Sequence, residues 1–138
     1  MLTLDRILGN FEILFEWEER YRYIIDLGKQ IESLEDVDRI EANRVQGCVS
    51  NVWLVTQVSE EQPPKLRFRA DSDAHIVRGL LVILLTAYSD KTAEEILDVD
   101  INAIFEQLEL SSHLSPSRSN GFFSMVERIR SLAGELAA

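Results

Sequence analysis

The chain has 138 residues, of which 46% are hydrophobic and 28% are charged, and these values are typical of one globular domain spanning residues 1–138. The formal net charge of −10 argues against a protein that binds nucleic acid or anionic membrane surfaces, because both need clustered lysine and arginine. The single cysteine excludes an intramolecular disulfide and a cysteine-rich metal site.

The N-terminal segment lacks the pattern of a targeting signal. Acidic residues run through residues 1–20, and no basic region precedes an apolar run. The most apolar stretch, residues 79–88, is too short to cross a bilayer and is typical of a buried core helix. We therefore expect a cytoplasmic protein, most simply a bacterial one.

Two helices are predicted near the start of the chain. In the first, apolar residues recur at helical spacing at Leu4, Ile7, Leu8 and Phe11. In the second, over residues 17–28, one face carries Trp17, Tyr21, Ile24 and Gly28. Glycine is also a common stop signal for a helix. A polar connection is expected over residues 29–43.

The pattern then changes to that of strands. Residues 51–58 are rich in β-branched and aromatic side chains, which predicts a strand. Residues 65–70 alternate, with Leu66, Phe68 and Ala70 facing inward and three basic residues facing outward. The short turn between these strands makes the pair antiparallel. Residues 44–47 are predicted to add a third short strand.

The remainder of the chain is predicted to be helical. Asp73 is expected to cap a helix over residues 74–89. Thr92 and Glu95 form a capping-box pattern, and a further short helix is expected over residues 101–108. Ser115 followed by Pro116 predicts the start of the last helix, whose core side would carry Phe122, Met125, Val126, Ile129 and Leu132. The expected fold is α+β, with a small antiparallel sheet packed by helices at both chain ends.

Cys48 is the leading candidate for a chemically reactive residue. It follows Gly47 in a predicted turn that leads into a strand, and glycine there permits a positive φ or a close backbone approach. Free cysteine is more often inert packing than a nucleophile, so position and composition alone favour a structural role.

The two histidines raise two other possibilities, a Cys–His hydrolase site and a metal site. His75 or His113 could pair with Cys48 in a cysteine-dependent hydrolase, although neither has a protease signature around it. A metal site is disfavoured because no two residues have ligand spacing such as CxxC or HxxxH. We therefore expect no metal and no resident cofactor.

Charged residues near two predicted helix starts form the next group of candidates. Asp71 and Asp73 suit the positive end of a helix dipole. Arg118 stands in the first turn of the last helix, where the dipole gives a cation no advantage. That mismatch indicates that Arg118 is held there by another contact.

Four sequence blocks occur in order along the chain: "WEERYRYIIDLG", "GCVSNVW", "ADSDAHIVRGL" and "HLSPSRSNG". In this order they resemble the SufE family of iron–sulfur cluster assembly proteins. The resemblance runs from about residue 11 to the last helix. It implies the SufE/IscU-like fold, a three-stranded antiparallel sheet packed by helices. It also implies that Cys48 takes persulfide sulfur from a cysteine desulfurase, stimulates that enzyme and passes the sulfur to a scaffold.

The resemblance also suggests partners and neighbouring site residues. The donor would be a SufS-type or CsdA-type desulfurase and the acceptor a SufBCD-type scaffold, so the protein would be a sulfur carrier without independent catalysis. By the same resemblance, the loop and nearby surface would include Gly47, Ser50, Asp71, Asp73 and Arg118. The sequence allows a homodimer. A different class of protein, an adaptor with a structural Cys48, stays as an alternative beside the hydrolase.

The chain departs from the family pattern beside the cysteine. The family usually has glutamine at the positions of Val49 and Asn51, and often glycine at Ala70. Val49 removes a polar group next to the nucleophile, which bears on loop polarity and partner choice.

Overall fold

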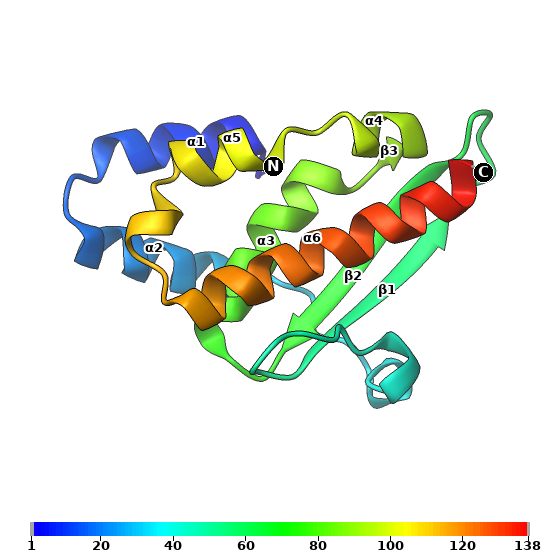
Figure 1. The fold of residues 1–138 in the computed structure, drawn as a ribbon, viewed down its shortest axis with the longest axis horizontal. Coiled ribbons are helices and arrows are strands. Elements are labelled where there is room, and N and C mark those ends of the chain that lie inside the picture. Colours follow the sequence, from blue (N-terminus) through cyan, green and yellow to red (C-terminus); the bar gives the residue numbers. More distant parts are fainter. Residues whose placement is uncertain (1, 138) are drawn as a thin grey trace.

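We describe residues 2–137 in a computed structural model of the chain. The helices are α1 (Leu4–Ile13), α2 (Trp17–Gly28), α3 (His75–Tyr88), α4 (Ala93–Leu97), α5 (Ile101–Gln107) and α6 (Pro116–Ala137). The strands are β1 (Val52–Val58), β2 (Lys65–Ser72) and β3 (Lys91–Thr92). Short 3-10 turns lie at Asp36–Asp38, Glu41–Asn43 and Leu110–Ser112. The α+β prediction is confirmed, and the long α6 runs obliquely across the molecule (Figure 1).

The sheet is three-stranded and antiparallel, in the order β1-β2-β3. The strand count was predicted, but the third strand was misplaced. It is Lys91–Thr92, which pairs with the start of β2, whereas Arg44 makes only an isolated bridge to Trp53. The reason is that residues 45–50 leave the sheet edge immediately to form a loop instead of continuing along β1.

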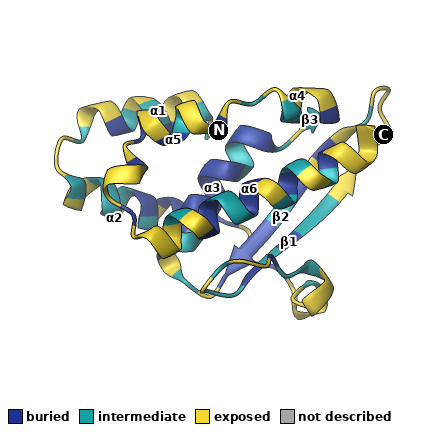
Figure 2. Ribbon diagram, viewed as in Figure 1, coloured by how far each residue is buried: buried dark blue, intermediate teal, exposed yellow. Residues whose placement is uncertain are grey.

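The two faces of the sheet differ as the alternation predicted. Leu66, Phe68 and Ala70 are buried on the inner face, against the helices (Figure 2). The outward basic residues each pair with an acid: Lys65 with Glu61 at 3.7 Å, Arg67 with Asp90 at 3.4 Å and Arg69 with Asp38 at 3.5 Å. Local ion pairing therefore accounts for the charge on this face.

Helix α3 forms the centre of the core. Nine of its residues are buried, and it contacts α1, α2, α6 and β2. The residues at its start differ from the prediction, because the N-cap is Ala74 and no side chain caps the helix. The Asp73 carboxylate turns instead to Asn51, accepting from its backbone N at 3.2 Å and its Nδ2 at 3.0 Å.

The later helix starts agree with the sequence. Thr92 and Glu95 form a complete capping box. At the start of α6, Ser115 Oγ accepts the backbone N–H of Arg118 at 3.3 Å. Within residues 2–137, we find no helix with the length and apolar character needed to cross a membrane.

Candidate functional site

The cysteine lies in a short loop that is fastened at both ends. At one end, Val45 N donates to Val52 O at 2.8 Å. At the other end, Asp73 holds Asn51 from one side, and Ser72 Oγ donates to the Asn51 carbonyl at 2.7 Å. The residues between these anchors make the excursion that carries Cys48.

Gly47 shapes the turn that carries the cysteine. Its φ is +89°, a conformation that side chains rarely adopt. A Cβ at this position would lie 2.5 Å from the Oγ of Ser124 on α6. Both facts explain the glycine, because the turn needs left-handed backbone and the Ser124 side chain leaves no room for a Cβ at this position.

Cys48 is half-buried, with its thiol directed at α6. It donates a weak hydrogen bond to the carbonyl oxygen of Gly121, with an Sγ···O distance of 3.5 Å. Burial raises the pKa of the Cys48 thiol, because the thiolate loses water that would stabilise its charge. In this resting position the loop therefore holds the sulfur as a protected thiol.

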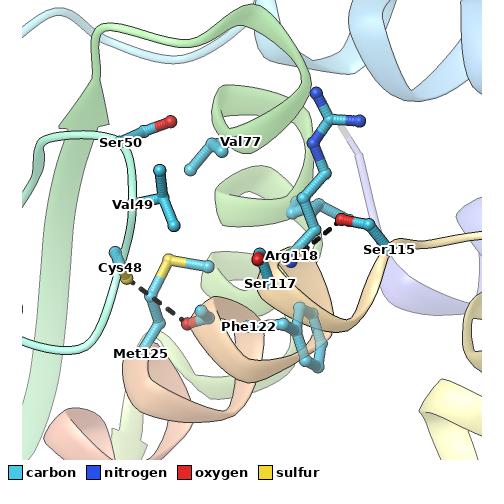
Figure 3. A pocket seen from close by; sticks show the side chains of 11 residues that line it. Cys48, Val49, Ser50, Val77, Ser115, Ser117, Arg118, Phe122 and Met125 are labelled. Carbon is cyan, nitrogen blue, oxygen red and sulfur yellow. Dashed lines mark hydrogen bonds between the residues drawn. The ribbon is translucent and has the colours of Figure 1, made fainter.

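A pocket of about 380 Å³ opens beside Cys48 (Figure 3). The loop contributes Cys48, Val49 and Ser50, and α3 contributes Val77 and Leu80. The start of α6 and the residue before it complete the lining with Ser115, Ser117, Arg118, Gly121, Phe122 and Met125. Apolar side chains and hydroxyl groups thus share the space next to the sulfur, and one cation stands among its lining residues.

Arg118 has the additional contact that its position in the helix indicated. Its Nη1 donates to the hydroxyl of Tyr21 at 2.7 Å, which ties the first turn of α6 to α2. The side chain lines the pocket and is exposed. The contact with Tyr21 of α2 therefore holds the Arg118 side chain among the pocket-lining residues, in a helix turn where the dipole gives a cation no advantage.

Val49 is the apolar residue most open to solvent at this site. It is 85% exposed, although it also lines the pocket beside Cys48. An exposed valine at the tip of a loop contributes little to the core. This chain therefore presents an apolar surface next to its sulfur.

The other predicted candidates lie in separate places. Ser50 lines the pocket, whereas Asp73 is exposed at the loop base. Asp71 is 1% exposed and outside the lining, in an ion-paired cluster on β2. His113 stacks on Trp17 with ring centroids 4.0 Å apart, and neither histidine lines the pocket. The described residues contain no group of three or more His, Cys, Asp or Glu that could hold a metal ion.

The sequence did not identify the residues on α6 that contact the Cys48 loop. Gly121 and Ser124 lie one helical turn apart and contact Cys48 and Gly47 respectively. A glycine at a buried position inside a long helix is the signal that could have identified Gly121, since such a glycine usually has a packing reason.

We expect Cys48 to alkylate severalfold more slowly with iodoacetamide at pH 8 than N-acetylcysteine does. Its raised pKa lowers the thiolate fraction, and its half-buried position restricts access. The rate should rise with pH through a midpoint above that of a free thiol. Unfolding in urea should abolish the difference, and a folded protein that reacts like N-acetylcysteine would contradict the protected position.

Comparisons with known proteins agree on one family. The family model described as "SufE: Fe-S metabolism associated domain" matches residues 5–133. An uncharacterized SufE-like protein of Rhizobium meliloti (strain 1021) is 49% identical over 140 residues, which cover 100% of both chains. A second, from Rhizobium etli, is 49% identical over 139 residues, covering 100% of this chain and 94% of that protein.

A solved structure shows the same fold at low sequence identity. The solution structure of a hypothetical protein from Thermus thermophilus aligns with a TM-score of 0.76 and 18% identity. The alignment covers 99% of this chain and 98% of that one. The family match over residues 5–133 and the two relatives at 49% identity show that the chain belongs to the SufE family of proteins associated with iron–sulfur metabolism.

Proposed function

We propose that this protein is a sulfur carrier that accepts the outer sulfur of a cysteine desulfurase persulfide on Cys48. The observation that carries the proposal is the placement of the chain's one cysteine at a loop tip, beside a pocket of about 380 Å³. Gly47, Ser50 and Arg118 serve this site as loop and pocket residues, while Asp73 fixes the loop base and Asp71 supports it from the sheet.

The transfer step needs a single thiolate in the acceptor. The Cys48 thiolate attacks the outer sulfur of the donor persulfide, so that one S–S bond forms and one breaks. The donor cysteine leaves as a thiolate, and the number of sulfane sulfur atoms is unchanged. A chain with one cysteine suits this step, since a second nearby thiol would discharge the persulfide as a disulfide.

The resting geometry suits storage better than attack. Burial disfavours the thiolate, so the loop must leave α6 for the sulfur to react with a donor. Between its fastened ends, the loop contacts α6 through one weak hydrogen bond from Cys48 to Gly121 and through the packing of Gly47 on Ser124. We assign activation to the complex with the desulfurase, in which the loop swings outward.

The proposed partners are a SufS-type or CsdA-type desulfurase as donor and a SufBCD-type scaffold as acceptor, all in the cytoplasm. Stimulation of the donor follows from removal of its product sulfur. A hydrolase is less well supported, because neither histidine lines the pocket and the thiol points to a carbonyl oxygen. An adaptor would not need the cysteine beside a pocket.

Incubation with a SufS-type desulfurase and cysteine, followed by removal of small thiols and intact mass measurement, tests the proposal. We expect the wild-type protein to gain one sulfur atom on Cys48 and the Cys48→Ser variant to gain none. Serine nearly preserves the size of the side chain, so the unfolding transition of the variant should stay close to that of the wild type.

The same reactions distinguish the alternatives. An unmodified wild-type mass in a reaction where the desulfurase is active would reject the carrier function. Desulfurase stimulation that survives in Cys48→Ser would favour the adaptor. Ester or peptide hydrolysis that depends on Cys48 would favour the hydrolase. A reaction without cysteine serves as the blank.

A further inference from the structure

Gly121 leaves open the space next to the sulfur of Cys48. It is a buried residue within α6, on the face that meets the loop. If it carried a Cβ, the nearest atoms outside its own helix turn would be Cys48 Sγ at 3.5 Å and Cys48 Cα and Cβ at 3.9 Å. A side chain at this position would therefore meet the cysteine before any other part of the protein.

This open space adjoins the pocket. Cys48 and Gly121 both line the cavity of about 380 Å³, and a Cβ on Gly121 would lie 3.5 Å from Sγ. The carbonyl oxygen of Gly121 lies 3.5 Å from Sγ and blocks a further atom along the line of the hydrogen bond. An atom added to the sulfur must therefore turn away from that oxygen by rotation about the Cβ–Sγ bond, and the space beside the glycine can accept it.

We propose that Gly121 is a positioning residue for the persulfide form. The space that it leaves open, because it has no side chain, accepts the outer sulfur of the Cys48 persulfide. The inference rests on the proposed function and extends it to a residue on α6. A sulfur bonded about 2 Å from Sγ and turned towards α6 would overlap a methyl group at this position. The thiol itself would keep an ordinary van der Waals contact with that methyl group.

Alanine at position 121 should therefore distinguish the two states of the cysteine. In the thiol state it fits the observed gap, and it removes the entropic cost of a glycine within a helix. In the persulfide state it fills the space that the outer sulfur needs, so the loop should spend more time away from α6. The outer sulfur would then be exposed to reductants.

The test loads the cysteine chemically, without a desulfurase. Polysulfide is added to the wild-type protein, Gly121→Ala and the matched control Gly134→Ala. The Cys48 thiolate attacks a sulfur atom of the polysulfide, forms an S–S bond and releases the shortened chain. Gly134 lies in the same helix, and a Cβ there would meet no described atom beyond its own helix within 4 Å, so its substitution changes helix propensity alone.

Loss of the persulfide is then followed by intact mass after addition of dithiothreitol. Dithiothreitol is oxidised to its cyclic disulfide, the outer sulfur leaves as hydrogen sulfide, and Cys48 returns to the thiol. We expect Gly121→Ala to lose its sulfur about tenfold faster than the wild type, the change that an ordinary overpacking penalty makes in an opening equilibrium. Gly134→Ala should match the wild type. Alkylation of the unloaded thiol by iodoacetamide should be unchanged in all three proteins.

Two results would overturn the inference. Equal persulfide lifetimes in Gly121→Ala and the wild type would show that the outer sulfur is held elsewhere. Equal acceleration of thiol alkylation and persulfide loss would show that Gly121 only lets the loop pack against α6.

Unfolding curves confirm that each variant is folded, and the Gly121→Ser variant tests a second small side chain at the same position. Because loading is chemical, failure of desulfurase transfer would reject the proposed function and leave this test intact.

Discussion

Replacing Gly79 with alanine is expected to lower the free energy of unfolding by about 3 kcal/mol or more, which is a large fraction of the stability of a small domain. A Cβ on Gly79 would overlap the carbonyl oxygen of Ile24 and lie 2.7 Å from its carbonyl carbon. Those are backbone atoms of α2, so no rotation of a side chain relieves the overlap. The two helices would have to separate, and α3 packs on both α2 and the sheet.

The close approach also involves a second glycine. A Cβ on Gly28 would lie 2.8 Å from the backbone N of Gly79, so the helices meet backbone to backbone at this pair. Alanine normally stabilises a helix relative to glycine by up to about 1 kcal/mol. A loss of stability in Gly79→Ala must therefore come from the overlap with α2.

Urea unfolding followed by circular dichroism measures the effect. Gly9→Ala in α1 is the matched control, because a Cβ at that position would have no described atom beyond its own helix within 4 Å. That variant should equal or slightly exceed the wild type in stability. A Gly79→Ala protein as stable as Gly9→Ala would contradict the close contact between α2 and α3.

The helices and two of the strands could be predicted because their signals are local. Helical spacing of apolar residues in α1, the alternation in β2 and the capping box at Thr92 all lie within a few residues of chain. These patterns reflect burial on one face, which the structure confirms in Leu66, Phe68 and Ala70.

The errors arose where a distant partner decides the structure. β3 has two residues, and it becomes a strand only because β2 lies beside it. Asp73 has the sequence context of an N-cap, yet Asn51, across the antiparallel strand pair from it, binds its carboxylate. Local propensity cannot report a competing partner that is brought near by the fold.

The candidate site divides in the same way. The turn at Gly47 and the presence of Cys48 are visible in the sequence. The residue on α6 that Cys48 contacts is not visible there, because Gly121 lies 73 residues further along the chain from Cys48. Only the packing of α6 across the molecule brings them together, and the pocket exists because of that packing.

Behind the site, Asp71 links the sheet to the segment that precedes the cysteine loop. Its carboxylate lies 2.7 Å from Arg39 Nη2 and 3.0 Å from Arg78 Nε. It also accepts the backbone N–H of Ser72 at 2.8 Å and that of Leu34 at 3.4 Å. Arg39 in turn lies over the ring of Trp53 on β1. One buried carboxylate thus joins β2, α3 and residues 34–39.

Replacing Asp71 with alanine is expected to cost about 3 kcal/mol, near the lower end for loss of one partner of a buried ion pair. The Asp71 side chain is 2% exposed, but Arg39 and Arg78 are 34% and 25% exposed, so water can partly solvate the guanidinium groups left behind. The free energy of unfolding from urea titration measures the loss.

The matched control for Asp71→Ala is Glu61→Ala. Glu61 pairs with Lys65 at 3.7 Å, and both side chains are about half exposed or more, so its removal should cost less than about 1 kcal/mol. Added salt should shrink the small effect at Glu61 and leave most of the larger effect at Asp71, because buried pairs are screened less. Equal losses in the two variants would contradict the support that Asp71 gives to the sheet, and with it the support from the sheet that we assign to the base of the Cys48 loop.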